Sequence, residues 1–331
     1  MPDRRPPQHG RTTMATAPPE TAISVTGLRK SFGEHVVLDG LDLTVPAGTV
    51  YSLLGANGAG KSTTVRILST LAASDGGSAR VRGHDLASEP DAVRAAIGVT
   101  GQFSAVDSLL TGEENLLLMA DLHHWPRRDG RRRAAELLRR FDLVDAAQRP
   151  ASTYSGGMRR RLDLAMTLVG DPQVIFLDEP TTGLDPRSRR AMWRIVRDLV
   201  STGVTVFLTT QYLEEADELA DRIGVLHHGR LVAEGTAEEL KRLVPGGHVL
   251  LRFADPTSLE NAERALDTSS RDNGTLALRV PSDGGLRSLR GVLSRLDDPS
   301  IEVEELSVRT PDLDDVFLAL TGQPGAEKVS T

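Results

Sequence analysis

The stretch that decides the fold is Thr49–Leu68, which reads TVYSLLGANGAGKSTTVRIL. An apolar run typical of a buried strand leads into a glycine-rich turn and then into a helix start, which is the full P-loop pattern in its usual setting. Lys61 can reach the β- and γ-phosphates of a nucleotide, and the Ser62 hydroxyl can bind Mg²⁺. A glycine turn that binds nothing is the alternative, but every required position is filled. The predicted nucleotide-binding residues here are Gly55, Ala56, Asn57, Gly58, Ala59, Gly60, Lys61, Ser62 and Thr63.

A second turn that faces phosphate is predicted at Tyr154–Met158, which reads YSGGM. Gly156 and Gly157 allow a close backbone approach to a ligand. The helix that follows, to about Val169, directs free N–H groups and the positive end of its dipole at an anion. Together with Ser155, these residues form a second predicted phosphate-binding element. One bound nucleotide does not easily use both phosphate-binding elements of a single subunit.

A catalytic strand is predicted shortly after this helix. Val174–Leu177 is a continuous apolar run, as expected of a central parallel strand, and Asp178 and Glu179 follow at its carboxyl end. Asp178 is placed to support Mg²⁺, and Glu179 to orient or deprotonate the attacking water. An acid pair that only ends the strand is the alternative. It is disfavoured because the P-loop supplies a phosphate for the pair to serve.

In order along the chain, these residues resemble the nucleotide-binding domain of ATP-binding cassette (ABC) transporters over roughly residues 21–240. The resemblance implies an α/β P-loop NTPase fold with a helical subdomain at about 103–168. It also implies ATP and Mg²⁺ as cofactors, and a head-to-tail homodimer in which the Ser155–Gly157 turn of one subunit closes on ATP held by the other. The matching residues are Phe32, Gly55 to Ser62, Gln102, Tyr154 to Met158, Asp178, Glu179 and Gly183 to Asp185.

The resemblance supports three further roles. Phe32 would stack on the adenine, although a lone Phe is more often a core residue. Gln102 would contact Mg²⁺ and sense a membrane subunit, although by itself it reads as an ordinary loop residue. Asp185 would cross the dimer interface.

The sequence departs from the family pattern at the second turn and after a later strand. Tyr154 and Met158 stand where Leu and Gln are usual, and Gln211 stands where the family typically has a histidine that contacts the γ-phosphate. A glutamine can donate a hydrogen bond but cannot carry a charge. We therefore expect Gln211 to take a catalytic position and to affect turnover more than the reaction itself.

Two segments, 210–217 (TQYLEEAD) and 312–322 (DLDDVFLALTG), are similar to a narrower group, the daunorubicin/doxorubicin-resistance-type export ATPases. This similarity implies export of an anthracycline-like drug or antibiotic through a separate membrane permease. It places the subunit on the cytoplasmic side of the cell membrane. Export of a lipid, polysaccharide or other metabolite is one alternative, and a non-transport ABC ATPase is another. The segment from Gln102 to Trp125 is the predicted docking region for the permease, with Phe103, Val106, Leu109, Leu110 and Leu116 as apolar contacts.

Composition agrees with this assignment. The net charge of −7 argues against nucleic acid as a partner, and the absence of cysteine excludes thiol chemistry and disulfides. No apolar run approaches the ~18 residues of a membrane-spanning helix, so the membrane path is expected from another chain.

The predicted domain organisation has four parts. Residues 1–20 and 323–331 are expected to be disordered. Between them lie the nucleotide-binding domain, 21–240, and a small α+β C-terminal domain, 241–322, with a β-α-β-α-β-α pattern. Its last helix is predicted to be capped by Thr310 with Pro311 in its first turn. A packing and dimer-stabilising role is favoured for this domain over a regulatory one.

Overall fold

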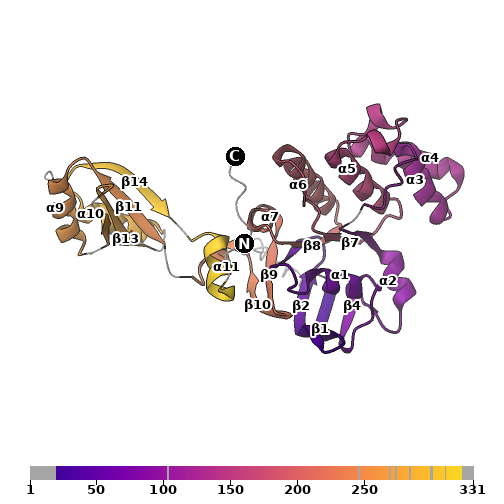
Figure 1. The fold of residues 1–331 in the computed structure, drawn as a ribbon, viewed down its shortest axis with the longest axis horizontal. Coiled ribbons are helices and arrows are strands. Elements are labelled where there is room, and N and C mark those ends of the chain that lie inside the picture. Colours follow the sequence, from indigo (N-terminus) through magenta and orange to yellow (C-terminus); the bar gives the residue numbers. More distant parts are fainter. Residues whose placement is uncertain are drawn as a thin grey trace, which may run out of the picture.

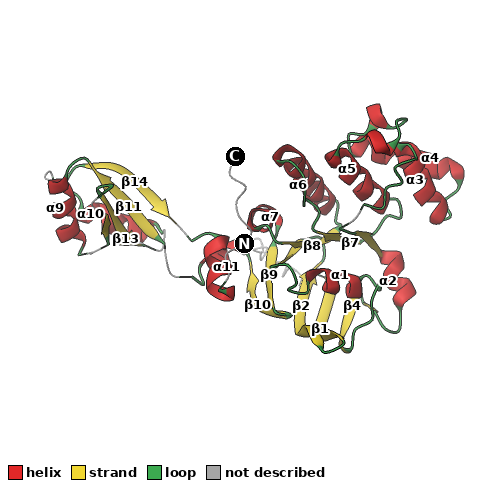
Figure 2. Ribbon diagram, viewed as in Figure 1, coloured by secondary structure: helices red, strands yellow, loops and turns green. Residues whose placement is uncertain are grey.

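The computed structural model describes residues 20–102, 104–244, 247–267, 270–272, 274–282, 285–298, 301–309 and 311–322. Residues 1–19 and 323–331, for which disorder is expected, lie outside the described residues, as do Phe103 and Thr310. The predicted nucleotide-binding domain forms the larger body and the C-terminal sheet the smaller one, with helix α11 between them (Figure 1). Figure 2 shows that both bodies mix helices and strands.

A six-stranded sheet forms the centre of the larger body, in the order β10-β9-β3-β8-β7-β6. Its strands are β3 (Val50–Leu54), β6 (Ile97–Thr100), β7 (Val174–Asp178), β8 (Thr205–Thr210), β9 (Arg222–His227) and β10 (Arg230–Gly235). All neighbours pair in parallel except β10, which is antiparallel to β9. Both faces of the sheet are covered, which explains the uninterrupted apolar runs of β3, β7 and β8. For example, Phe176 packs in the core on one face and Ile175 in the core on the other.

One face of this sheet is covered by α1 (Lys61–Leu68) and an antiparallel sheet with the order β2-β1-β4-β5. The strands of that sheet are β1 (Thr21–Phe32), β2 (His35–Pro46), β4 (Gly76–Val81) and β5 (His84–Asp85), and α2 (Pro90–Ala96) follows them. The side chains of β1 and β2 alternate between the core and the surface, as expected where only one face of a sheet is buried.

The other face is covered by α5 (Gly156–Thr167) and α6 (Pro186–Ser201), and the helical subdomain adds α3 (Gly112–Leu122) and α4 (Arg127–Arg140). A capping box fixes the start of α3: the Thr111 hydroxyl accepts from Glu114 N, and the Glu114 carboxylate accepts from Thr111 N. Short 3₁₀ turns at Val144–Ala146 and Ala151–Thr153 lead from α4 into the turn that opens α5.

The smaller body is a four-stranded antiparallel sheet, β12-β13-β11-β14, with two helices on one face. Its elements are β11 (His248–Phe253), α9 (Pro256–Leu266), β12 (Arg271–Asp272), β13 (Ala277–Pro281), α10 (Leu286–Arg295) and β14 (Val303–Arg309). They follow the predicted strand and helix alternation, with β12 as an additional short strand. We call this body, 248–309, the accessory sheet domain.

Helix α11 (Leu313–Thr321) does not belong to the accessory sheet domain, contrary to the predicted boundary at 322. Its buried side chains, Leu313, Val316 and Phe317, share a core with α7 (Leu213–Leu219), α8 (Ala237–Lys241) and the end of β3. The predicted cap was also wrong. Asp312 caps the helix by accepting a 3.1 Å hydrogen bond from Asp315 N, so Pro311 lies before the helix. The apolar face was read correctly, but an amphipathic face does not identify the surface that it covers.

Candidate functional site

The phosphate loop connects β3 to α1 and keeps a shape that few side chains allow. Gly60 has φ 110°, and a Cβ at this position would lie 2.9 Å from the Val37 carbonyl oxygen. Lys61 is buried, and its ammonium group donates to the carbonyl oxygens of Gly55 at 2.9 Å and Ala56 at 3.2 Å. The first turn of α1 has free backbone N–H groups beside this ammonium group, which makes the loop a strong site for anions. Asn57 and Gly58 are exposed at its tip.

Asp178 joins three elements at the carboxyl edge of the sheet. Its Oδ1 accepts hydrogen bonds from Ser62 Oγ on α1 at 3.1 Å and from Thr209 Oγ1 on β8 at 2.5 Å. The structure thus brings together Ser62 and Asp178, two of the three residues predicted to bind Mg²⁺. Both offer oxygen atoms, the ligands that this hard cation prefers, so the donors fit the ion.

Glu179 is held in a conformation that non-glycine residues rarely adopt, with φ 48°. Its backbone N–H donates to Thr209 O and Thr209 Oγ1, both at 3.1 Å. Its carboxylate lies 3.3 Å from Lys61 Nζ, and both side chains are buried. The strained backbone therefore directs the carboxylate into the phosphate site, and a phosphate group there would compete with Glu179 for Lys61.

Gln211 follows β8 directly and lies beside the same loop. The preceding residue, Thr210, accepts from Gly55 N through its carbonyl oxygen at 3.2 Å, and Thr209 bonds to Glu179. The side chain of Gln211 is half-buried. Gln211 thus follows a strand end that bonds to both the phosphate loop and Glu179, and its catalytic role stays a prediction.

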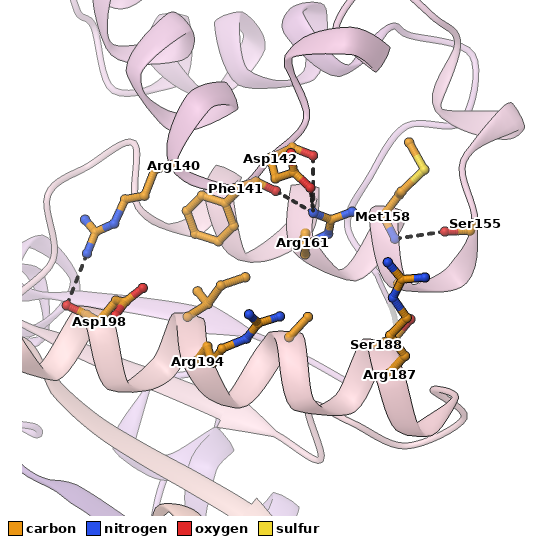
Figure 3. Close-up of a pocket in the computed structure, with 13 residues that line it drawn as sticks. Arg140, Phe141, Asp142, Ser155, Met158, Arg161, Arg187, Ser188, Arg194 and Asp198 are labelled. Carbon is orange, nitrogen blue, oxygen red and sulfur yellow. Dashed lines mark hydrogen bonds and ion pairs between the residues drawn. The ribbon is translucent and has the colours of Figure 1, made fainter.

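The second turn opens a helix, α5, as the sequence predicts. Ser155 is the N-cap and accepts from Met158 N at 3.2 Å (Figure 3). A Cβ on Gly157 would lie 2.5 Å from Ser188 Oγ, so only glycine allows this approach of α5 to α6. The described residues show no hydrogen bond or ion pair between this turn and the phosphate loop of the same chain.

A polar pocket of about 460 Å³ adjoins this turn, between the end of α4 and α6 (Figure 3). Arg161 on its wall is engaged by Asp142 at 3.1 Å, and Arg140 donates to the carbonyl oxygen of Asp198 at 3.4 Å. Arg187 and Arg194 also line the pocket. The pocket therefore carries an excess of positive charge next to the predicted trans ATP contact.

Asp185 is the N-cap of α6. It accepts from Ser188 N at 2.9 Å and from Ser188 Oγ at 2.6 Å, and these hydrogen bonds lower the pKa of its carboxyl group. The residue is exposed, so it remains accessible to a second subunit.

Phe32 ends β1 with 53% of its surface exposed, and Lys30 Nζ lies 5.3 Å from the centre of its ring. The alternative reading of Phe32 as a core residue is therefore wrong. Gln102 is also exposed, in the loop after β6. Phe32 therefore offers an exposed aromatic ring, which adenine stacking needs.

Sequence reasoning missed a buried ion pair on α5 that holds the Gln102 loop. Arg160 donates to the carbonyl oxygens of Gly101 at 2.8 Å and Pro180 at 2.9 Å, and to Asp163 at 3.2 Å. Asp163 in turn accepts from Ala105 N at 3.1 Å. Burial raises the pKa of Asp163 and lowers that of Arg160, against the opposing effect of their pairing. The signal in the sequence was two opposite charges three residues apart on an otherwise apolar helix face.

A second missed residue is Glu215 on α7, whose carboxylate is fully buried. Trp193 Nε1 on α6 donates to it at 3.1 Å. Burial is the main reason that its pKa is raised. Through Trp193, Glu215 therefore links α7 to α6, the helix that Asp185 caps.

Comparison with known proteins places this site in a family. The ABC transporter family model matches residues 38–182. The chain is 52% identical to the daunorubicin/doxorubicin resistance ATP-binding protein DrrA of Streptomyces peucetius, covering 94% of this chain and 95% of that protein. It is 47% identical to the doxorubicin resistance ATP-binding protein DrrA of Mycobacterium tuberculosis, covering 92% and 95%. It is 35% identical to the Nod factor export ATP-binding protein I of Sinorhizobium fredii, covering 97% and 95%.

A solved ATP-binding subunit of an ABC transporter superposes with a TM-score of 0.61 at 29% identity, covering 67% of this chain and 93% of that one. An ATP-binding cassette in its ADP conformation, at 24% identity and a TM-score of 0.60, shares the fold. The identity over nearly the whole chain and the arrangement of Lys61, Asp178 and Glu179 lead to one conclusion: this chain belongs to the ABC transporter family as an ATP-binding, ATP-hydrolysing subunit.

Proposed function

We propose that this subunit powers export of an anthracycline-like drug or antibiotic through a separate membrane permease. The observation that carries the proposal is the identity of 52% and 47% with two drug-resistance ATP-binding proteins, over more than nine-tenths of the chain. The relative named for Nod factor export is less similar, at 35%, so drug export is preferred over export of another metabolite.

Hydrolysis would use the residues at the carboxyl edge of the sheet. Lys61 and the loop N–H groups would hold the phosphates, while Ser62, Asp178 and Gln102 would hold Mg²⁺, which offsets phosphate charge. Glu179 would accept a proton from the attacking water, and the Gln211 amide would hydrogen-bond the γ-phosphate. The support for these roles is the 3.3 Å separation of Glu179 and Lys61 and the shared contact of Ser62 and Thr209 with Asp178.

A homodimer would complete each ATP site. Ser155, Gly156 and Gly157 carry a helix N-terminus that makes no contact with the phosphate loop of the same chain in the described residues. Because such a terminus attracts anions, the turn is suited to a phosphate held by a second copy. Asp185 would lie at the same interface, on the adjacent helix α6.

The permease would dock on the helical subdomain, although not through all the residues predicted. Val106 and Leu116 are buried and belong to the core, so they are not available as contacts. Leu109 is 87% exposed, and Leu118 and Leu122 on α3 are also exposed, so these three form the docking surface in the proposal. In the part of the chain that the structure describes, no helix is long and apolar enough to cross a membrane. Docking would hold the subunit on the cytoplasmic side.

Drug accumulation in cells tests this function. The subunit would be co-expressed with a candidate membrane permease in a sensitive host, and daunorubicin uptake would be followed by its fluorescence. We expect lower accumulation and higher resistance with the native chain than with Glu179→Gln. Equal accumulation, with both proteins present in the membrane fraction, would refute drug export. Leu109→Asp should reduce membrane recruitment without loss of ATP binding.

A further inference from the structure

The accessory sheet domain has an open edge at β14. This strand has seven residues and pairs only with β11 among the strands that the structure describes. Leu306 and Val308 lie opposite Leu251 and Val249 in the ladder and therefore on the face that packs against α9 and α10. Leu251 and Val249 are fully buried, whereas Leu306 and Val308 are 36% and 40% exposed. The helices thus cover β11 but leave the edge strand partly bare.

An open edge recruits another strand unless its side chains prevent pairing. β14 carries three charged residues, Glu304, Glu305 and Arg309. Whether a second strand can pair with β14 therefore depends on the residues that lie opposite these charges. In an antiparallel pair, residues directly opposite each other lie on the same face of the sheet. If two copies of β14 pair about a two-fold axis at Ser307, Glu305 lies opposite Arg309 and Leu306 opposite Val308. Each of these two pairs therefore occurs twice in the dimer, once on each side of the axis.

Neighbouring registers are less favourable. An axis at Leu306 puts Glu305 opposite Ser307, and an axis at Glu305 puts two carboxylates opposite each other. Like charges directly opposite are destabilising in a sheet, whereas opposite charges and apolar pairs stabilise it. The sequence of β14 is therefore self-complementary in the register centred on Ser307.

We propose that β14 pairs antiparallel with β14 of a second copy of this chain, centred on Ser307, so that the two accessory sheets join into one. Glu305 already lies 3.3 Å from Arg252 on the open face of the sheet, and the partner's Arg309 would approach the same carboxylate. The proposal rests on the proposed function in that a dimeric ATPase brings the second copy near. This proximity raises the effective concentration of the second edge.

The absence of cysteine makes a direct test possible, because any introduced thiol is the only one in the chain. In Ser307→Cys the two thiols face each other across the axis, at a Cα separation that a disulfide can bridge. In the matched control, Val308→Cys, the thiols are offset by two residues along the strand, about 7 Å, in addition to the strand spacing. That offset exceeds the reach of a disulfide. We expect Ser307→Cys to form a disulfide dimer about tenfold faster or more than Val308→Cys under mild oxidation.

A charge exchange provides the second part of the test. Arg309→Glu places two carboxylates opposite each other and should reduce crosslinking of Ser307→Cys, and Glu305→Arg in the same chain should restore it. With Lys61→Ala added, crosslinking should slow in all variants because the ATP-dependent proximity is lost. The order of their rates should stay the same, because the pairing register of β14 does not depend on bound ATP. If Ser307→Cys still crosslinks faster than Val308→Cys in the Lys61→Ala background, β14 pairing does not depend on the ATP-dependent dimer. The two proposals can then fail independently. Equal crosslinking of Ser307→Cys and Val308→Cys, no crosslinking of either, or no rescue by the charge exchange would overturn the proposal.

Discussion

Replacing Glu179 by Gln should uncouple ATP binding from hydrolysis, and the structure indicates the size of both effects. Glu179 Oε1 lies 3.3 Å from Lys61 Nζ, a separation at which two unit charges attract by about 5 kcal/mol at an effective dielectric constant of about 20. Desolvation offsets part of this attraction, and a hydrogen bond to a charged group is worth about 1.5–3 kcal/mol net. Binding of ATP must redirect Lys61 to phosphate and so give up this interaction.

The substitution removes the competing carboxylate and keeps the size of the side chain. We therefore expect Glu179→Gln to bind ATP·Mg²⁺ about ten- to a hundredfold more tightly, since 1.4 kcal/mol corresponds to about a tenfold change. Loss of the general base should lower turnover by about 10²–10⁴-fold. ATP should consequently hold the variant as a dimer, because binding survives and hydrolysis does not.

Calorimetric titration and phosphate release measure the two effects separately, and size-exclusion chromatography with ATP reports the dimer. Glu238→Gln, an exposed carboxylate on α8, is the matched control and should leave both quantities unchanged. If Glu179→Gln kept most of its turnover, Glu179 would not be the base. If its affinity for ATP did not change, the ion pair with Lys61 would not compete with phosphate.

Three further predictions concern residues around the site. Arg160→Met or Asp163→Leu alone should each destabilise the protein by about 3–5 kcal/mol in denaturant unfolding, because each leaves a buried partner unpaired. The double variant with both substitutions should cost less than the sum of the two, and additive losses would contradict this. Glu215→Gln should raise the melting temperature relative to the native chain, and the gain should grow as pH rises. The reason is that a carboxyl group with a raised folded pKa favours the folded state only while protonated. A gain in melting temperature that grew on acidification would contradict the raised pKa. Gln211→Ala should slow turnover by a factor corresponding to about 1 kcal/mol or more, and Gln211→His should be tolerated; unchanged turnover in Gln211→Ala would place the residue outside the site.

The parts of the structure that depend on local sequence could be predicted, and those that depend on distant contacts could not. The strand, turn and helix around Lys61 follow from adjacent residues, as do the buried strand before Asp178 and the helix that the Ser155–Gly157 turn opens. The contacts of Arg160 with Gly101 and Pro180 join segments on both sides of it in the chain, so spacing does not reveal them. Burial explains the misassigned docking contacts: the apolar character of Val106 and Leu116 is the same whether they face a core or a partner.

The position of α11 has a consequence for synthesis of the protein. The core that it shares with α7, α8 and the end of β3 is made of segments translated long before it, with the whole accessory sheet domain between them. A chain emerging from the ribosome therefore presents the apolar surface around Leu54 and Val225 without its cover until Phe317 has left the exit tunnel. The nucleotide-binding domain, although it comes first, cannot complete its packing before α11 is made. Truncation before α11 should thus destabilise the first domain as well.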